Sequence, residues 1–255
     1  MTISQSSVWP NGCLGAVSLT FDDGDSSQLA RAVPLMRERA LRGTFYVCPR
    51  EQDYRAQLAP WKELADRGHE IGNHSLSHTC SRNFSRDPDA KGLERSTLEE
   101  IEADIVEAER RLQEVIPAEH RSFAYPCYQT DVGEGLTRQS YVPAVARHLV
   151  AGRATGEYGF FNTPLNCDLH CLWCVGAEHR RGPEMVGFVE RAARAGQWLI
   201  FAFHAIDGGR LGVAEYEFAE LLDHLAANRS RIWTAPVAEI AAHLMAIKRA
   251  LQATG

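Results

Sequence analysis

Two adjacent carboxylates, Asp22 and Asp23, end the apolar run of LTFDDG at residues 19–24. Like charges this close repel one another, especially in a partly dry cleft, so the pair is costly unless a cation or a proton neutralises it. Because Asp and Gly both favour turns, an ordinary turn would also explain the pattern. If the pair is functional, it indicates metal binding by one carboxylate and proton transfer by its neighbour.

Two histidines supply further candidate ligands. NHSLSH at residues 73–78 places His74 and His78 four positions apart, and in a helical turn this spacing puts both imidazoles on one face. Two imidazole nitrogens and one carboxylate oxygen would leave open positions for water and substrate, as catalytic zinc requires. We therefore expect one divalent metal ion, zinc being favoured over cobalt or nickel.

Strands and helices alternate along the chain, which predicts βαβ units and a parallel α/β barrel. The helix at 96–116 shows capping-box spacing between Ser96 and Glu99 and is followed by Pro117. No linker or repeat is visible, so we predict a single domain over residues 1–255. The expected strands cover residues 16–21, 43–48, 69–75, 122–127, 198–204 and 231–235, and the expected helices cover residues 26–41, 58–68, 96–116, 141–151, 184–195, 215–227 and 236–251.

Chemistry in parallel α/β folds gathers at the carboxyl ends of the strands. The two aspartates, the two histidines, Pro126, Cys127 and His204 all follow or end predicted strands. We expect them to converge on one pocket, where His204 would protonate a leaving group.

Four motifs resemble those of the polysaccharide deacetylases in order and spacing: TFDDG, HEIGNHSLSH, FAYPC and LIFAFH. This family is the NodB-homology group of carbohydrate esterases, and the resemblance is to carbohydrate esterase family 4. The resemblance implies a distorted (β/α)7-8 barrel that removes acetyl groups from oligo- or polysaccharides. It assigns Asp22 as catalytic base, Asp23, His74 and His78 as metal ligands, His204 as catalytic acid, the Cys127 amide as oxyanion donor, and Tyr125 and Pro126 as its neighbours in a substrate-binding motif.

Two departures from the family pattern leave the substrate open. Many members carry an arginine where this chain has Ala124, and Arg121 lies three residues earlier. The Asp and Trp of the fourth motif have no clear match, and Trp173 is the candidate for substrate contact. Either N-linked or O-linked acetyl groups therefore fit the pattern.

Other functions remain open. A hydrolase of small cyclic amides or formyl groups on the same fold is the strongest alternative, followed by a carbohydrate-binding relative without turnover. CDLHCLWC, with Cys167, Cys171 and Cys174, resembles the iron–sulfur motif of radical SAM enzymes, but only 81 residues follow it. A 2-His-1-carboxylate set also suits non-haem Fe(II) oxygenases, which generally have all-β jelly rolls.

The composition excludes several partners. A net charge of −6 without a sustained Lys/Arg run argues against nucleic acid, and no apolar stretch is long enough to span a membrane. The first residues lack the apolar core of a signal peptide, so the chain as written is expected to be cytoplasmic, or secreted if the sequence is trimmed. Seven cysteines, an odd number without the dense spacing of a disulfide scaffold, favour mostly reduced thiols. The oligomeric state is not predicted.

Overall fold

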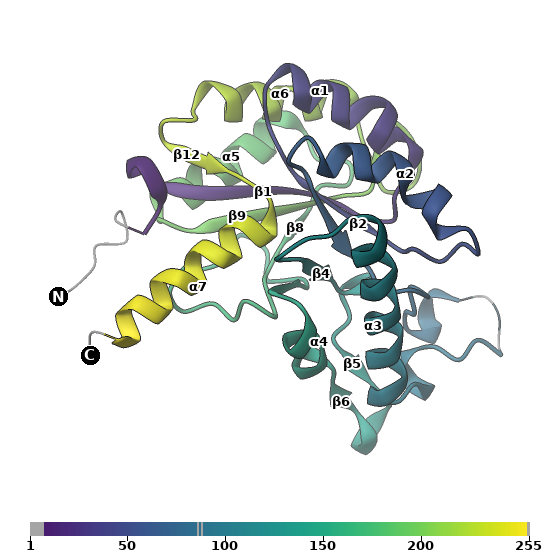
Figure 1. Ribbon diagram of the computed structural model, residues 1–255. Helices are drawn as coiled ribbons and strands as arrows, with labels where there is room; N and C mark the ends of the chain where they lie inside the picture. Colours follow the sequence, from purple (N-terminus) through teal and green to yellow (C-terminus); the bar gives the residue numbers. More distant parts are fainter. Residues whose placement is uncertain (1–7, 86, 88, 254–255) are drawn as a thin grey trace.

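A parallel sheet forms the centre of the protein, for which a computed structural model describes residues 8–85, 87 and 89–253 (Figure 1). Its middle strand, β1 (Gly15–Phe21), is buried at every position. On one side β1 pairs with β9 (Trp198–Phe203), and on the other its carboxyl half pairs with β2 (Thr44–Val47). Because both faces of a central parallel strand are covered, the strand reads as a continuous apolar run rather than an alternating one.

The sheet curls into a distorted barrel, as predicted. Its strand order is β7-β4-β3-β2-β1-β9-β8, and β12 joins the amino half of β1. The two end strands approach one another through Leu172, which forms a parallel bridge with Arg153. The remaining strands of this sheet are β3 (Glu70–Asn73), β4 (Ser122–Ala124), β7 (Ala151–Arg153), β8 (Val175–Gly176) and β12 (Ile232–Thr234).

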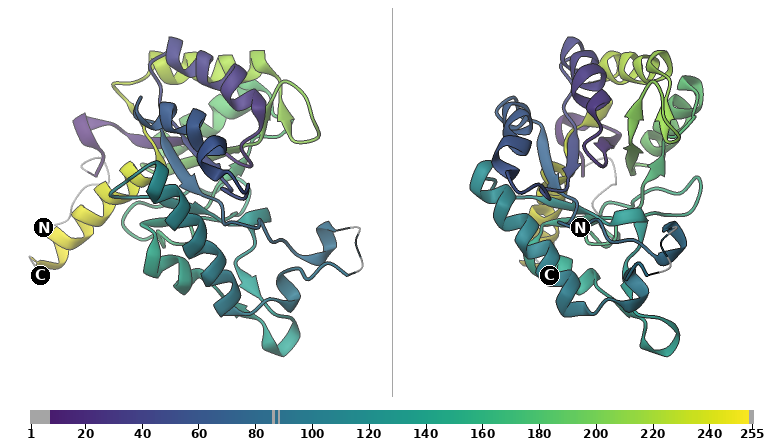
Figure 2. Two further views of the ribbon diagram at one scale, coloured as in Figure 1. Left: turned by 45° about the vertical axis from the view of Figure 1, so that its right-hand side comes forward. Right: turned by 90° about the vertical axis from the view of Figure 1, so that its right-hand side faces the viewer.

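Helices cover the outside of the curled sheet, and the β5–β6 hairpin projects from it (Figure 2). A π-helical turn at Gln28–Ala32 leads into α1. The helices are α1 (Val33–Glu38), α2 (Tyr54–Ala65), α3 (Leu98–Val115), α4 (Val142–His148), α5 (Gly182–Arg194), α6 (Glu215–Ala227) and α7 (Val237–Ala253). Short strand pairs are β5 (Asp131–Val132) with β6 (Gln139–Ser140) and β10 (Ala205–Ile206) with β11 (Gly212–Val213). Single 3₁₀ turns lie at Pro10–Gly12, Arg82–Phe84, Leu93–Arg95, Pro126–Tyr128 and Gly135–Thr137.

Two expectations about the elements need correction. The capping box of α3 is formed by Thr97 and Glu100 rather than by Ser96 and Glu99. The Ser96 hydroxyl instead donates to the Gly92 carbonyl, which leaves Thr97 as the extended residue at the helix start. The sequence patterns also gave no sign of β7 or β8, and β7 lies at the end of a segment expected to be helical.

The core fixes the carboxyl ends of the central strands. Phe21 stacks on Phe45 and Phe203, with ring centroids 4.7 and 5.3 Å apart, and all three rings are fully buried. These aromatic residues each precede or lie close to the end of a central strand, so their packing holds the strand ends in register. Within the described ranges, no helix combines the length and the apolar character needed to cross a bilayer.

Candidate active site

The strand ends bring the predicted catalytic and ligand residues together. Asp22 follows β1, His74 follows β3 and His204 follows β9. The Asp22 N–H donates to the Phe203 carbonyl at 2.9 Å, so the aspartate and the histidine that follows Phe203 leave neighbouring strands side by side. The carboxyl edge of the parallel sheet is therefore the candidate site, as the strand-end rule predicts.

A tight turn separates the two aspartates. Asp23 has a φ of +69° and Gly24 a φ of +67°, so the chain turns sharply straight after β1. A side chain at Gly24 would also meet the Trp61 ring at 3.3 Å, which favours glycine here. As a result Asp22 is buried, with 3 % exposure, whereas Asp23 is exposed.

Asp23, His74 and His78 form a compact donor set. Asp23 Oδ1 lies 3.1 Å from His78 Nε2 and 3.5 Å from His74 Nε2. Although burial of Asp23 opposes ionisation, its hydrogen bonds with the two imidazoles lower the pKa of this carboxyl well below its usual range. The three ligand atoms lie within 4.8 Å of one another, which suits a single small cation.

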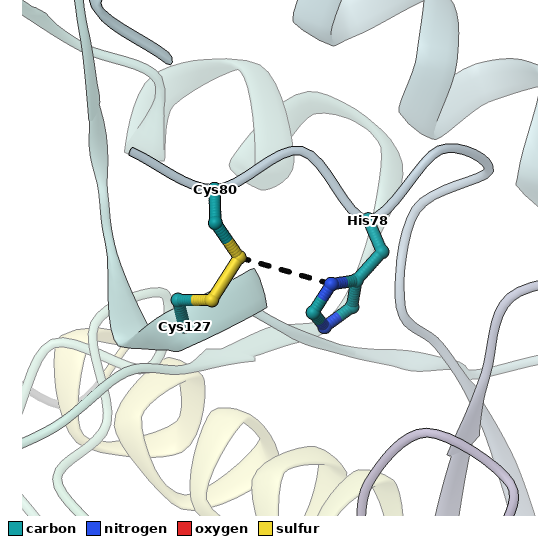
Figure 3. Close-up of side chains that lie close together, drawn as sticks. All are labelled: His78, Cys80 and Cys127. Atoms are coloured by element: carbon teal, nitrogen blue, oxygen red, sulfur yellow. Dashed lines mark hydrogen bonds between the residues drawn. A yellow bond between two sulfur atoms is a disulfide. The ribbon is translucent and has the colours of Figure 1, made fainter. Parts of the chain in front are cut away.

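The two histidines reach this arrangement without a helical turn, contrary to our expectation. Residues 74–81 are irregular, and Ser75 and His78 have φ values of +62° and +54°. His74 Nδ1 lies 2.8 Å from the Ala124 carbonyl, which can only accept, so Nδ1 carries a proton. Nε2 faces Asp23: it donates to that carboxylate when it is protonated, and in the neutral ring its lone pair would be free for a cation. His78 Nδ1 faces the Cys80 sulfur at 3.7 Å (Figure 3).

The Asp22 carboxylate is neutralised by a buried arginine. Arg153 Nη2 lies 2.6 Å from both carboxylate oxygens, and the Arg153 side chain is fully buried. The guanidinium also lies over the rings of Tyr46 and Tyr128, at 5.2 and 5.3 Å from their centroids. A buried carboxylate needs such a partner, since an unpaired charge in the interior is strongly destabilising.

His204 is held between two carboxylates. Its Nδ1 lies 3.2 Å from Glu178 Oε1, and its Nε2 lies 3.9 Å from Asp22 Oδ2. Burial alone would favour the neutral imidazole, but the close contact with Glu178 and the charges of Asp22 and Asp23 raise the pKa of His204 above its usual value. The geometry therefore places an imidazole whose pKa is raised beside the Asp22 carboxylate, an arrangement suited to acid–base chemistry.

Comparison with known proteins finds a matching family for part of the chain. Residues 12–133 match the sequence profile of the family described as Polysaccharide deacetylase. Over these residues the sequence is similar to that of the polysaccharide deacetylases. The resemblance inferred from the four motifs is thereby confirmed.

Individual relatives match a short stretch of the sequence or share the fold at low sequence identity. A peptidoglycan-N-acetylglucosamine deacetylase from Bacillus cereus is 33% identical over 72 residues, which is 27% of this chain and 32% of the length of that relative. A family 4 acetyl xylan esterase from Clostridium thermocellum, in complex with a cobalt ion, shares the fold with a TM-score of 0.53, 16% identity, and coverage of 88% of this chain and 89% of that one. A CE4 family pseudoenzyme from Bacillus anthracis gives a TM-score of 0.56 and 14% identity over 89% of this chain and 65% of that one.

Two charged residues that the sequence analysis missed contact the predicted base and acid. Arg153, at the end of β7, contacts Asp22, whereas Arg121 pairs with Glu109 at 2.9 Å and does not reach the site. Glu178, two residues after β8, contacts His204. The signal that could have found both is the strand-end rule itself, applied to two strands that the patterns did not reveal.

The substrate-binding residues expected from the third motif have unequal positions. Tyr125 is fully buried, and its hydroxyl donates to the His170 carbonyl, so its side chain belongs to the core. Pro126 is buried and begins the turn that presents Cys127. Cys127, which has a φ of +52°, forms a disulfide with Cys80. The expectation of mostly reduced thiols holds for five cysteines and fails for this pair.

Trp173 lies apart from the catalytic residues. Its backbone carbonyl and N–H both bond to the Asn162 side chain, and Asn162 in turn pairs with Trp198 at the amino end of β9, opposite to His204. Trp173 lines a separate cavity of about 440 Å³ together with Gln197. The structure therefore does not bring Trp173 to the pocket of Asp22.

The cysteines of CDLHCLWC form no metal site. Cys174 is buried against Arg153, with its sulfur 3.3 Å from Nη1, while the Cys167 sulfur faces the Pro164 carbonyl. In the part of the chain that the structure describes, clusters of potential ligands contain Asp23, His74 and His78, or His78, Cys80 and Cys127, and none joins the three cysteines. The iron–sulfur alternative thus has no support, and the parallel sheet contradicts the jelly-roll oxygenase alternative.

Proposed function

We propose that the protein is a metal-dependent hydrolase that removes N- or O-linked acetyl groups from a carbohydrate. The observation that carries this proposal is the placement of Asp22 and His204, 3.9 Å apart, beside the donor set of Asp23, His74 and His78. The name of the Bacillus cereus relative, a peptidoglycan-N-acetylglucosamine deacetylase, supports a carbohydrate substrate. Retention of both a base and an acid argues for turnover, because binding alone needs neither.

The donor set fits a zinc ion. The contact of His74 Nδ1 with the Ala124 carbonyl directs Nε2 at Asp23. With three protein ligands, the ion would keep coordination positions open for water and substrate. Cobalt or nickel would suit the same ligands, and the Clostridium thermocellum esterase contains cobalt. When bound, such an ion polarises a carbonyl and lowers the pKa of water towards 7.

Asp22 acts as the general base in this proposal. Its carboxylate is held by Arg153 and lies next to the donor set, so it can accept a proton from the attacking water. The Cys127 N–H then donates to the oxyanion of the tetrahedral intermediate. One such donor is commonly worth about 3 kcal/mol of barrier.

His204 completes the cycle by giving its proton to the departing amine or alcohol. Its raised pKa favours the protonated form that this step needs, and Glu178 orients the ring through Nδ1. Nε2 is consequently the nitrogen that faces Asp22 and the reacting group.

A polar cavity supports a carbohydrate ligand. About 430 Å³ in volume, it is lined by Tyr128 and Gln129, which directly follow Cys127, and by charged groups including Glu94 and Arg138. Sugar hydroxyls need such donors and acceptors when they leave water.

Acetate release tests the proposal. The zinc-loaded protein should release acetate from at least one of acetylated chitin, peptidoglycan or xylan fragments, and Asp22→Asn should abolish the release. Turnover of small cyclic or formyl amides without acetate release would favour the alternative hydrolase. Tight binding of these fragments without any turnover would instead indicate a carbohydrate-binding relative.

A further inference from the structure

A disulfide joins two loops of the candidate site. Cys80 lies two residues after the ligand His78, and Cys127 is the expected oxyanion donor; the two are 47 positions apart in the sequence. Figure 3 shows the bridge beside the His78 imidazole, with the Cys80 sulfur 3.7 Å from Nδ1. Among all seven cysteines, which the described residues include, this is the one disulfide.

Residues 74–81 form no helix or strand, and Cys127 lies in the single 3₁₀ turn Pro126–Tyr128. His78, Cys127 and Tyr128 have φ values of +54°, +52° and +59°, conformations that residues with a side chain rarely adopt. Such backbone persists only where the surroundings over-determine it. The chain reaches Cys80 from β3 and Cys127 from β4, so a covalent bond between them fixes the two loops relative to each other.

We propose that Cys80 is a positioning residue: through its disulfide it holds the Cys127 N–H towards the oxyanion and the His78 imidazole towards Asp23. The same two loops are also joined by the Ser81 N–H, which donates to Gln129 Oε1 at 2.7 Å. We expect the Asp23–His78 contact of 3.1 Å and the left-handed turn at Cys127 to weaken when the covalent bond is lost and this hydrogen bond remains. The role of the disulfide in placing the Cys127 N–H rests on the proposed function. Its role in placing His78 rests on the donor set alone.

The bond is open to a small reductant because Cys80 and Cys127 are both half-buried. A water-soluble trialkylphosphine supplies two electrons to the disulfide, takes one oxygen atom from water to become the phosphine oxide, and leaves two cysteine thiols. No metal ligand is consumed in this step. Reduction therefore breaks the covalent link between the two loops while leaving Asp23, His74 and His78 chemically unchanged.

The test compares the oxidised protein, the phosphine-reduced protein and the variant Cys80→Ser/Cys127→Ser, in which neither of these two positions can offer a thiolate to the metal. Alkylation under denaturing conditions should count five thiols before reduction and seven after it. Cys167→Ser, in which another half-buried cysteine outside the site is replaced, is the matched control. Each protein is assayed for acetate release and titrated with cobalt well below its melting temperature.

We expect kcat to fall about tenfold in the reduced protein and in the double variant, with KM changed less than about twofold, because an oxyanion donor acts in the transition state. Reoxidation should restore the wild-type kcat. The cobalt dissociation constant of the double variant should rise about tenfold, the range seen when a partner that orients a ligand is lost. The control should behave as wild type in both measurements.

Unchanged kcat and unchanged cobalt affinity, with seven thiols counted after reduction, would overturn the proposal. Seven thiols in the protein before reduction would overturn it as well. If no form releases acetate, the proposed function fails. Weaker cobalt binding by the double variant would then still support the positioning of His78 by the disulfide.

Discussion

Asp22 and Asp23 are adjacent in sequence yet are stabilised by different partners. Arg153 contacts both oxygens of Asp22 in the interior, whereas Asp23 faces two imidazoles at the edge of the pocket. The repulsion expected between neighbouring carboxylates is thus offset twice, once by a guanidinium and once by the donor set that would hold a cation. This division leaves Asp22 outside the ligand set and available for proton transfer.

His204→Ala should affect amide and ester substrates unequally. An amide nitrogen needs a proton to depart, whereas an alkoxide is the better leaving group. Loss of the acid should lower N-deacetylation about 10²- to 10⁴-fold and O-deacetylation much less. Acetate release from matched N- and O-acetylated sugars measures the difference. Equal losses on both substrates would count against His204 as the acid.

Glu178→Gln should change the pH dependence of the reaction. Because Glu178 contributes to the raised pKa of His204, its removal lowers that pKa. His204 must be protonated to act, so activity disappears as the pH rises through its pKa, and the alkaline limb of kcat/KM should move to lower pH. At neutral pH the loss should be roughly tenfold, as for a hydrogen bond to a charged group. An alkaline limb at the wild-type pH would exclude this role.

Arg153→Gln should destabilise the fold through Asp22. Removing one partner of a buried ion pair costs about 3–5 kcal/mol, since the other charge stays buried. Asp22→Asn combined with Arg153→Gln removes both charges, so we expect urea unfolding to show a smaller loss than the sum of the two single losses. Additive losses would mean that the pair does not couple.

At the scale of elements, the sequence predicted the strand ends that carry Asp22, His74 and His204 but missed those that carry Arg153 and Glu178. Asp22 and His204 follow long apolar runs, and His74 follows the short run EIGN, which comes after a predicted helix that ends at a glycine. β7 and β8 are only three and two residues long, with the sequences AGR and VG, and they lack the β-branched or aromatic pattern of a strand. Their extended conformation depends on pairing with β4 and β9, which no local pattern encodes.

Gln28, in the π-helical turn after β1, connects the carboxyl ends of β1 and β9. The buried Gln28 amide donates to the carbonyls of Asp22 at 2.6 Å and of His204 at 2.8 Å. Gln28→Ala should therefore move the base and the acid apart and lower kcat tenfold to about 100-fold, the cost of a displacement near 1 Å. The matched control is Gln57→Ala, which removes a similar bond to the Cys48 carbonyl. Equal kcat values for the two variants would contradict this role.

For the molecule as a whole, the periodic patterns were sufficient to predict a parallel barrel with its chemistry at one edge. The Cys80–Cys127 disulfide was not predictable, because its cysteines are far apart in sequence and meet only through the positions of β3 and β4. The same is true of the ion pair between Asp22 and Arg153. Contacts between distant loops follow from the assembled sheet rather than from local sequence.

The central claim is that one divalent ion is bound by Asp23, His74 and His78 with no sulfur ligand. X-ray absorption at the zinc edge of the oxidised, zinc-loaded protein tests it most directly, with Asp23→Ala as the comparison. We predict one zinc per chain, a first shell of nitrogen and oxygen with two imidazoles, and loss of this spectrum in Asp23→Ala. A sulfur scatterer at about 2.3 Å, or a protein that retains no zinc, would contradict the account.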